Sequence, residues 1–321
     1  MGEFDLIDRY FKKPARHSDL GIGDDCALLR TSPGHQLAVS TDMLVEGRHF
    51  LSTVNPRHLG HKALAVNLSD LAACGARPKA FLLSLALPRV DEAWLEGFSA
   101  GLFQLAQLHD CELIGGDTTQ GPLNISITVL GEVPHGQALL RSGAQVGDDV
   151  YVSGTLGDAR LALEAFRGHI GLPEAVFTHA RARMETPTPR VLLGLALRGI
   201  ATAAADISDG LLGDLGHILK ASGVGASLDL GLANSLLGCG AFWSGPSDLI
   251  ETCILSGGDD YELVFTAPSH CRALVQAAAT QSDTPVTRVG TVRSALGIDV
   301  LDALGQALTR QFTSFDHFAA S

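Results

Sequence analysis

The feature of this sequence that most restricts its fold is the alternation of helical segments with short apolar runs. Apolar residues recur at helical spacing from Pro56 to Cys74, and the pattern ends at Gly75. Residues 80–87 then form a short apolar run typical of a buried strand. The same region predicts a helix at 92–108 and strands at 37–42, 112–114 and 124–131. Helices that alternate with strands predict an α/β or α+β fold.

The alternation resumes after a break in the middle of the chain. Residues 133–149 are rich in glycine and include Pro134, which makes this segment the best candidate for a domain boundary. Beyond it the sequence predicts strands near 150–153, 226–230, 262–266 and 286–292, and helices near 157–166, 188–199 and 210–221. A single core has usually stopped growing at a length of 321 residues, so we expect two domains, 1–136 and 137–321.

The charge balance restricts the partners. The chain has 23 Lys+Arg and 35 Asp+Glu, a net charge of −12, which is the wrong sign for binding nucleic acid. Acidic side chains still allow phosphate ligands when divalent metals lie between the two. With 46% hydrophobic residues the composition is that of a globular chain rather than a disordered one.

The cysteines and the apolar segments indicate a cytoplasmic protein. None of the six cysteines forms a C-x-x-C pair, and their wide spacing is a poor zinc signature, so we expect buried, reduced thiols. The N-terminus lacks the pattern of a signal peptide. The longest apolar stretch, Val191 to Ala205, is interrupted by Arg198 and is too short to cross a membrane.

Many acidic residues lie in six short clusters flanked by Gly or Ser. A single such cluster is most simply a turn or a helix cap. Several of the six, however, follow predicted strands, where open α/β sheets place their ligands. The clusters are residues 21–25, 40–42, 67–70, 115–117, 206–210 and 257–260.

The chemistry of these clusters suits magnesium and phosphate. Mg²⁺ prefers hard oxygen ligands from carboxylates, water and phosphate, and glycines let the backbone approach a phosphate closely. No P-loop, dinucleotide fingerprint, kinase H-R-D or D-F-G, zincin or G-x-S-x-G motif occurs in the chain. The clusters therefore predict a metal-assisted polyphosphate site of another type.

Seven segments in order resemble the thiamine-monophosphate kinases, a family within the aminoimidazole-ribonucleotide synthetase-like enzymes. The resemblance extends from residue 21 to the closing FDHF at 315–318. The segments are GIGDDCALL, STDMLVEGRHF, KALAVNLSDLAACGARP, LIGGDTTQGPL, RSGAQVGD, DISDGLLGDLGHI and SGGDDYELVF.

The resemblance implies direct transfer of the γ-phosphoryl group of ATP to thiamine monophosphate, with several Mg²⁺ ions. It also implies a two-domain synthetase-like fold and a homodimer. The N-terminal domain would bind ATP and Mg²⁺ and pair with its twin into an intersubunit β-barrel, and the C-terminal α/β domain would close the active-site cleft.

The resemblance also assigns roles to individual residues. The implied metal ligands are Asp25, Ser40, Thr41, Asp42, Asp70, Asp117, Asp206 and Asp209. The implied ATP-binding residues are Gly116, Asp117, Arg141 and Ser208, and the implied substrate-binding residues are His49, Asp259 and Phe315. No catalytic acid or base is assigned, because metal-assisted phosphoryl transfer to an ionised phosphate depends on positioning and on charge neutralisation.

Two positions depart from the family pattern, and two other functions stay open. Asp259 replaces a usual Glu, and Phe315 stands where Tyr or Trp is common.

The first alternative function is another ATP-using synthetase of the same superfamily. The second is a non-catalytic protein that binds metal or nucleotide. The other acids near the motifs, Asp24, Asp148, Asp214 and Asp260, are interpreted as solvated neighbours, turns or caps.

Overall fold

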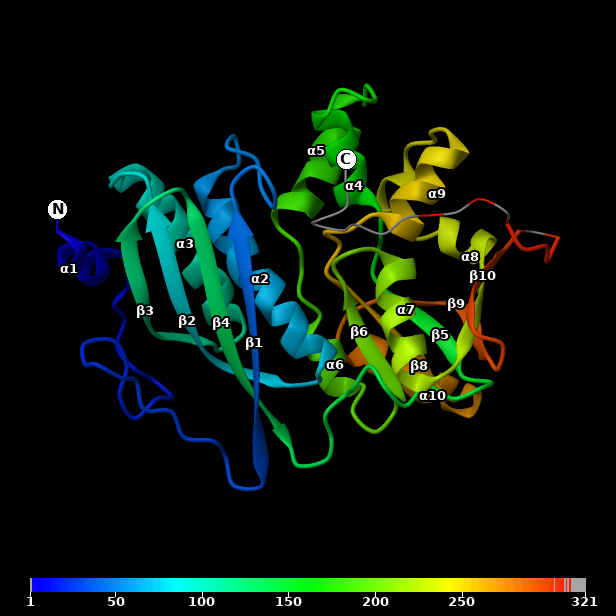
Figure 1. The fold of residues 1–321 in the computed structure, drawn as a ribbon, viewed down its shortest axis with the longest axis horizontal. Helices are drawn as coiled ribbons and strands as arrows, with labels where there is room; N and C mark the ends of the chain where they lie inside the picture. The colour runs from blue at the N-terminus through cyan, green and yellow to red at the C-terminus, as the bar shows by residue number, and fades with distance from the viewer. Residues whose placement is uncertain (1, 303, 309, 311, 313–321) are drawn as a thin grey trace. The chain divides into compact units, whose positions relative to one another are not determined.

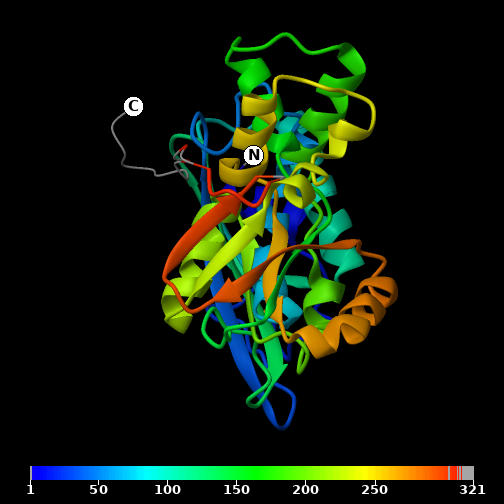
Figure 2. The same cartoon turned by 90° about the vertical axis from the view of Figure 1, so that its right-hand side faces the viewer.

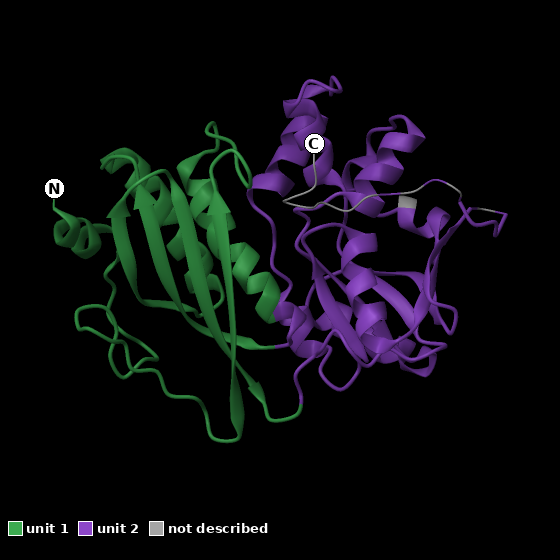
Figure 3. Cartoon of the chain, in the orientation of Figure 1, with its two compact units in different colours: residues 1–71, 76–136 green, residues 72–75, 137–321 purple. Residues whose placement is uncertain are grey.

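A computed structural model describes residues 2–302, 304–308, 310 and 312. The chain divides into two compact units, coloured separately in Figure 3. Unit 1 consists of residues 1–71 and 76–136, and unit 2 consists of residues 72–75 and 137–321. Across the described residues, no helix is both long enough and apolar enough to cross a membrane.

Unit 1 is a four-stranded sheet with the strand order β1-β4-β2-β3. Two helices lie against the same face of this sheet (Figure 1). The strands are β1 (His35–Val45), β2 (Arg77–Leu87), β3 (Glu112–Gln120) and β4 (Asn124–Pro134), and the helices are α2 (Pro56–Ala73) and α3 (Glu92–Leu108). The chain begins with α1 (Glu3–Leu6) and η1 (Ile7–Phe11). The sheet with its helices confirms the predicted mixed α/β class.

Strand β3 is longer than the sequence predicts. The expected strand stopped at residue 114, yet β3 continues through Gly115, Gly116 and Asp117. It continues because β2 runs parallel to it and supplies backbone partners, with Leu83 opposite Gly116 and Ser84 opposite Asp117. Strand pairing therefore overrides the turn preference of the two glycines.

Unit 2 is built on a six-stranded sheet with the strand order β10-β7-β9-β5-β8-β6. Figure 2 shows β10, β7 and β9 side by side. The strands are β5 (Asp149–Ser153), β6 (Ala203–Ile207), β7 (Gly225–Asp229), β8 (Glu262–Ala267), β9 (Val286–Arg293) and β10 (Gly297–Leu301). The helical elements are α4 (Asp158–Phe166), α5 (Glu174–Glu185), α6 (Val191–Ala196), α7 (Leu211–Ser222), α8 (Leu230–Asn234), η2 (Gly238–Ala241), α9 (Ser247–Ser256), η3 (Ser269–Cys271) and α10 (Arg272–Gln281).

The cysteines are reduced but only partly buried. All six are free, and Cys111, Cys239 and Cys253 are buried. Cys26 is exposed and two others are half-buried, so the expectation of buried thiols is wrong for half of the set.

A largely buried ion pair between Glu132 and Lys79 anchors β4 in unit 1. The Glu132 carboxylate accepts hydrogen bonds from the Ser32 N–H and hydroxyl at 3.0 and 2.8 Å and from Lys79 Nζ at 3.1 Å. Burial raises the pKa of Glu132, but these hydrogen bonds outweigh it and lower the pKa from 4.5 to about 2. The folded state therefore favours the ionised form.

We expect Glu132→Gln to lower the free energy of unfolding by about 1–3 kcal/mol near neutral pH, because the amide cannot replace the ionised acceptor. The wild-type contribution is fully present above pH 4.5 and is lost as the pH falls through about 2. Urea unfolding of both proteins across this range measures the difference. A difference that stays constant down to the acid end would contradict the assignment.

Candidate functional site

The first group of predicted ligands lies between β1 and α2. Ser40 Oγ donates a hydrogen bond of 2.5 Å to Asp70 Oδ2, and the Asp42 N–H donates to Asn67 Oδ1 at 3.1 Å. Asn67 and Asp70 are three residues apart in α2, so both side chains emerge on one face of that helix. The structure thus brings Ser40, Asp42 and Asp70 together at the helix-covered side of the sheet.

The second group lines a cavity of about 1120 Å³ in unit 1. Asp25, Gly116 and Asp117 belong to its wall, together with Asp24 and Ser84. Both aspartates of the 24–25 pair and Asp117 are exposed. A cavity of this size can hold a nucleotide. Five acidic residues (Glu3, Asp8, Asp24, Asp25 and Asp117) and one lysine, Lys12, line it, so its wall is net acidic and favours a cation.

Strand register separates these two groups. Asp42 is in register with Ile127 of β4, while Asp117 is in register with Ser84 of β2 and thereby with Ser126. Neighbouring positions on a strand point to opposite faces, so Asp42 and Asp117 project from opposite faces of the sheet. The predicted unit 1 ligands therefore do not converge on one point within the unit.

Thr41 also lies apart from its two neighbours in sequence. Its hydroxyl donates to the Ile127 carbonyl at 3.0 Å and lies 3.1 Å from Thr128 Oγ1. By the same alternation its side chain is on the face opposite to Ser40 and Asp42. The structure places Thr41 on the face of the sheet that also carries Asp117.

Gly116 fits a role in close backbone approach. Its φ of +144° is one that side-chain-bearing residues rarely adopt, and a Cβ there would lie 1.8 Å from the Leu83 carbonyl oxygen. Only glycine therefore keeps β3 paired to β2 beside the cavity.

His49 lies in the turn after β1 and is half-buried. Its Nδ1 accepts a hydrogen bond from the Val45 N–H at 3.0 Å, and its carbonyl accepts one from Lys62 Nζ at 3.3 Å. The acceptor role of Nδ1 leaves Nε2 as the nitrogen that carries a proton in the neutral ring. That nitrogen is the one suited to donate to an anion.

In unit 2 two of the acidic loops lie side by side. Strand β6 pairs with β8, which brings the loop at 206–210 next to the loop at 257–260. The Asp259 N–H donates a hydrogen bond to the Ser208 carbonyl, and the Tyr261 N–H donates one to the Ile207 carbonyl, both at 2.9 Å. Asp206 is buried at the end of β6, and Asp209 is half-buried. The structure therefore brings Asp206, Ser208, Asp209 and Asp259 into one region of unit 2.

Asp214 holds the first of these loops. Its Oδ2 accepts hydrogen bonds from the Ser208 N–H at 3.1 Å and from the Asp209 N–H at 3.0 Å. Burial raises the pKa of Asp214 to about 7, against the effect of these N–H groups and of the Arg141 charge. Arg141 is exposed and close enough to act on this carboxylate, so it belongs to the same region.

Asp259 adopts a backbone conformation that favours a short polar side chain. Its φ is +69°, in the left-handed region, and the Tyr261 hydroxyl donates to its Oδ1 at 2.9 Å. Asp tolerates this region better than most residues, which gives a physical reason for Asp in place of the usual Glu. Phe315, the other departure, lies outside the described residues.

The structure also identifies three polar residues to which sequence reasoning assigns no functional role. Asn67, 1% exposed, orients the Asp42 backbone, and Asp214 orients the loop at 206–210. Glu262 is fully buried and bound by two arginines. Asn67 and Glu262 both lie inside the quoted motifs, so their polar character within apolar segments was the available signal.

The donor atoms in all three groups suit a hard cation. Apart from His49, the predicted ligands and their close neighbours offer carboxylate, hydroxyl and carbonyl oxygens, which Mg²⁺ prefers. Among the described residues, the only thiol that lines the unit 1 cavity is that of Cys26, and thiolates are poor Mg²⁺ ligands. The residues present therefore fit magnesium.

Comparison with known proteins places these features in a family. Residues 23–133 match the N-terminal domain, and residues 145–300 the C-terminal domain, of AIR synthase related proteins. The chain is 46% identical to the thiamine-monophosphate kinase of Salmonella typhimurium strain LT2, over 99% of this chain and 98% of the relative. The relative from Bacillus subtilis strain 168 is 36% identical, over 91% and 92% of the two chains.

Two solved structures agree with these relatives. The thiamine-monophosphate kinase of Stenotrophomonas maltophilia K279a superposes with a TM-score of 0.83 at 47% identity, covering 91% of this chain and 92% of that one. AaThiL complexed with AMPPCP and TMP gives a TM-score of 0.75 at 31% identity, covering 90% and 89%.

We expect Gly258→Ala to disturb the two adjoining loops of unit 2. A Cβ at Gly258 would lie 2.4 Å from the Ser208 carbonyl oxygen, so the loop that carries Asp259 must shift, and we expect a loss of about 1–3 kcal/mol in unfolding free energy. Urea unfolding measures it. Gly216→Ala is the matched control, because nothing lies within 4 Å of its Cβ and alanine favours the helix. Equal stability of the two variants would show that the loops are not tightly packed.

Proposed function

This chain belongs to the thiamine-monophosphate kinase family, and we propose that it transfers the γ-phosphoryl group of ATP to thiamine monophosphate. The products are thiamine diphosphate and ADP. Support comes from relatives up to 46% identical over nearly the whole chain and from a neighbour complexed with AMPPCP and TMP. The observation that carries the proposal is the unit 1 cavity, where Asp24, Asp25 and Asp117 adjoin the exposed backbone of Gly116.

Magnesium is proposed as the ion that makes the transfer possible. Two anionic phosphates must approach within bonding distance, and bound Mg²⁺ would neutralise their charge and orient them. The proposed ligands in unit 1 are Asp25, Ser40, Thr41, Asp42, Asp70 and Asp117, and those in unit 2 are Asp206 and Asp209. The acceptor phosphate is already ionised near neutral pH, so the reaction needs no strong general base.

Contacts to the two substrates themselves are also proposed. ATP would contact Gly116, Asp117, Ser208 and Arg141, whose guanidinium is the one cationic group of this set. Thiamine monophosphate would contact His49 and Asp259, with Phe315 as the proposed stacking partner. Unit 1 is thus proposed as the ATP- and Mg²⁺-binding domain, with unit 2 supplying the remaining ligands.

The direct test is turnover. The full-length protein is incubated with Mg²⁺, ATP and thiamine monophosphate, and thiamine diphosphate is quantified by chromatography, with parallel reactions lacking Mg²⁺. We expect product only when all three are present. A folded protein that binds ATP but forms no thiamine diphosphate would sink the proposal. ATP hydrolysis without this product would favour another synthetase, and metal binding without turnover would favour a non-catalytic protein.

We expect Asp42→Asn and Asp70→Asn each to reduce kcat by about 100-fold or more, because an amide binds Mg²⁺ far more weakly than a carboxylate. The fold should persist, since the Asp42 backbone remains bonded to Asn67 and an amide oxygen at position 70 can still accept from Ser40. Steady-state kinetics and circular dichroism measure the two effects.

Glu96→Gln is the matched control for charge removal in unit 1. Glu96 is exposed in α3, on a helix that carries none of the proposed ligands. Normal activity in both aspartate variants would show that the ligand assignment is wrong.

We also propose a homodimer formed through the open face and edge of the unit 1 sheet. Leu37, Val39 and Met43 of β1 are 44%, 58% and 55% exposed, and β1 is an edge strand of eleven residues. Long apolar edges invite pairing with another chain. A second copy paired here would continue the sheet toward the intersubunit β-barrel that the family resemblance implies.

Val39→Lys is expected to weaken this dimer, because it places a charge in the middle of the apolar row. Light scattering after size exclusion at micromolar concentration should then give the mass of a monomer, against a dimer for the wild type. Leu108→Lys, at the end of α3 and 76% exposed, is the control for an added charge. A monomeric wild type, or a dimeric Val39→Lys, would refute the interface.

We propose a cytoplasmic location because the cysteine thiols are reduced. All six cysteines are free, and Cys26 is exposed. Reducing compartments keep such thiols in this state.

A further inference from the structure

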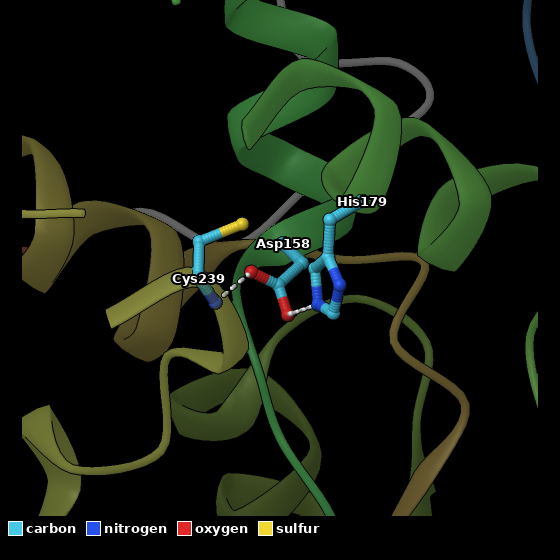
Figure 4. Close-up of side chains that lie close together, drawn as sticks. All are labelled: Asp158, His179 and Cys239. Atoms are coloured by element: carbon cyan, nitrogen blue, oxygen red, sulfur yellow. Dashed lines mark hydrogen bonds and ion pairs between the residues drawn. The ribbon is translucent and has the colours of Figure 1, made fainter. Parts of the chain in front are cut away.

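Three side chains from separate segments of unit 2 meet at the start of α4. Asp158 is the first residue of α4, His179 lies in α5 and Cys239 lies in η2 (Figure 4). One ligand atom of each lies within 4.8 Å of the other two. None of the three belongs to the residues proposed above for magnesium, ATP or thiamine monophosphate.

The Asp158 carboxylate has an oxygen that lacks a hydrogen bond. Its Oδ1 accepts the Cys239 N–H at 2.9 Å, but among the described residues its Oδ2 has no hydrogen-bond partner. The side chain is only 1% exposed. A buried carboxylate oxygen without a donor costs free energy, so a cation or a proton is needed beside it.

His179 faces this oxygen without satisfying it. Its Nε2 lies 3.7 Å from Asp158 Oδ2, which is beyond hydrogen-bond distance (Figure 4). The ring packs edge-on against Phe242, with centroids 5.5 Å apart and an angle of 81°. Its side chain is 42% exposed, so an ion could reach the group from solvent on this side.

Cys239 supplies a thiol as the third possible ligand. The residue is fully buried, and its Sγ contacts the Val176 carbonyl at 3.7 Å. Burial, together with the Asp158 charge, raises the pKa of the Cys239 thiol. Such a thiol is a poor nucleophile, which makes a role in redox sensing unfavourable. A metal ion that binds here would have to displace the thiol proton, so its binding should strengthen as the pH rises.

The donor set selects the class of cation. A set that combines histidine nitrogen, cysteine sulfur and carboxylate oxygen is typical of Zn²⁺. Mg²⁺ prefers oxygen ligands alone, so the nitrogen and the sulfur disfavour it here. Ligand atoms around one tetrahedral Zn²⁺ lie about 3.3–3.6 Å apart, given bond lengths of about 2.0–2.3 Å. The 3.7 Å between Nε2 and Oδ2 is already close to this, and all three ligand atoms lie within 4.8 Å of one another, so side-chain movements of about 1 Å would complete the set.

We propose that Asp158, His179 and Cys239 bind one Zn²⁺ ion that fixes α5 and η2 to the start of α4. The fourth position of a tetrahedral ion would be filled by water on the exposed His179 side. The ion would bind Asp158 Oδ2, which has no hydrogen-bond partner among the described residues. This site uses none of the residues proposed for the kinase reaction.

The site adjoins the acidic loop at 257–260. The Gly157 N–H, one residue before Asp158, donates to both oxygens of buried Asp260 at 3.0 and 3.1 Å. Burial raises the pKa of Asp260 well above its usual range. Zinc bound at Asp158 would therefore restrain the Gly157 peptide on which that loop rests.

The test measures zinc and cobalt binding to the full-length protein in excess Mg²⁺, which occupies the oxygen-only sites. We expect one Zn²⁺ per chain in competition with a chromophoric chelator, and Co²⁺ should give a thiolate charge-transfer band. His179→Ala, which removes a half-exposed side chain and should fold, is expected to weaken zinc binding by about tenfold or more. Cys239→Ser should abolish the cobalt band.

His217→Ala and Cys271→Ser are the matched controls, since they remove a histidine and a cysteine elsewhere in unit 2. Zinc should also raise the Tm of the wild type but not that of His179→Ala. The site is refuted if zinc binds equally to wild type and His179→Ala, if the thiolate band survives in Cys239→Ser, or if no zinc binds at micromolar concentration. In the last case Asp158 and His179 form an ion pair alone.

Discussion

Unit 2 depends on one buried carboxylate. The Glu262 side chain is fully buried and accepts hydrogen bonds from Ser153 Oγ at 2.6 Å, from Arg183 Nη2 at 2.8 Å and from two nitrogens of Arg190 at 2.6 Å. Removing a partner from such a charge costs several kcal/mol, so all three must be in place when the unit folds. They come from β5, α5 and the segment before α6, and Glu262 begins β8. The interaction therefore fixes the end of the loop that carries Asp259.

In unit 1 the governing constraint is the two-residue repeat of a strand. It directs Ser40 and Asp42 toward α2 and directs Thr41 and Asp117 to the other face. The same repeat exposes Leu37 and Val39 beside Thr41 on β1. One face of a single sheet thus carries both a carboxylate for cations and an apolar row suited to a second chain. The proposed cation ligands and the proposed subunit interface therefore share strands of one sheet.

What the sequence predicts depends on local patterns. Helix α2 and strand β2 were predictable because each is rich in apolar residues and bounded by Pro or Gly, and the acidic clusters because Gly, Ser and Asp mark loops. Strand β6 was missed because Ala203–Ile207 is rich in alanine, a helix former, and becomes a strand only by pairing with β8. Helix α5 was missed because its apolar period is weak, and helices α9 and α10 were missed as well. Which acids share a face could not be predicted, since that requires the register.

The group around Asp158 illustrates this limit further. Its ligands come from three segments with no characteristic spacing, so no sequence motif indicates them. Their meeting follows from tertiary structure: His179 and Arg183 are four residues apart on α5 and so share a face of that helix. Arg183 is held by Glu262, and this bond sets the rotation of α5 that brings His179 over Asp158. The buried Glu262 charge, which fixes the end of the loop at 257–260, thereby also positions the proposed zinc ligand, so a change that releases Arg183 should disturb both features together.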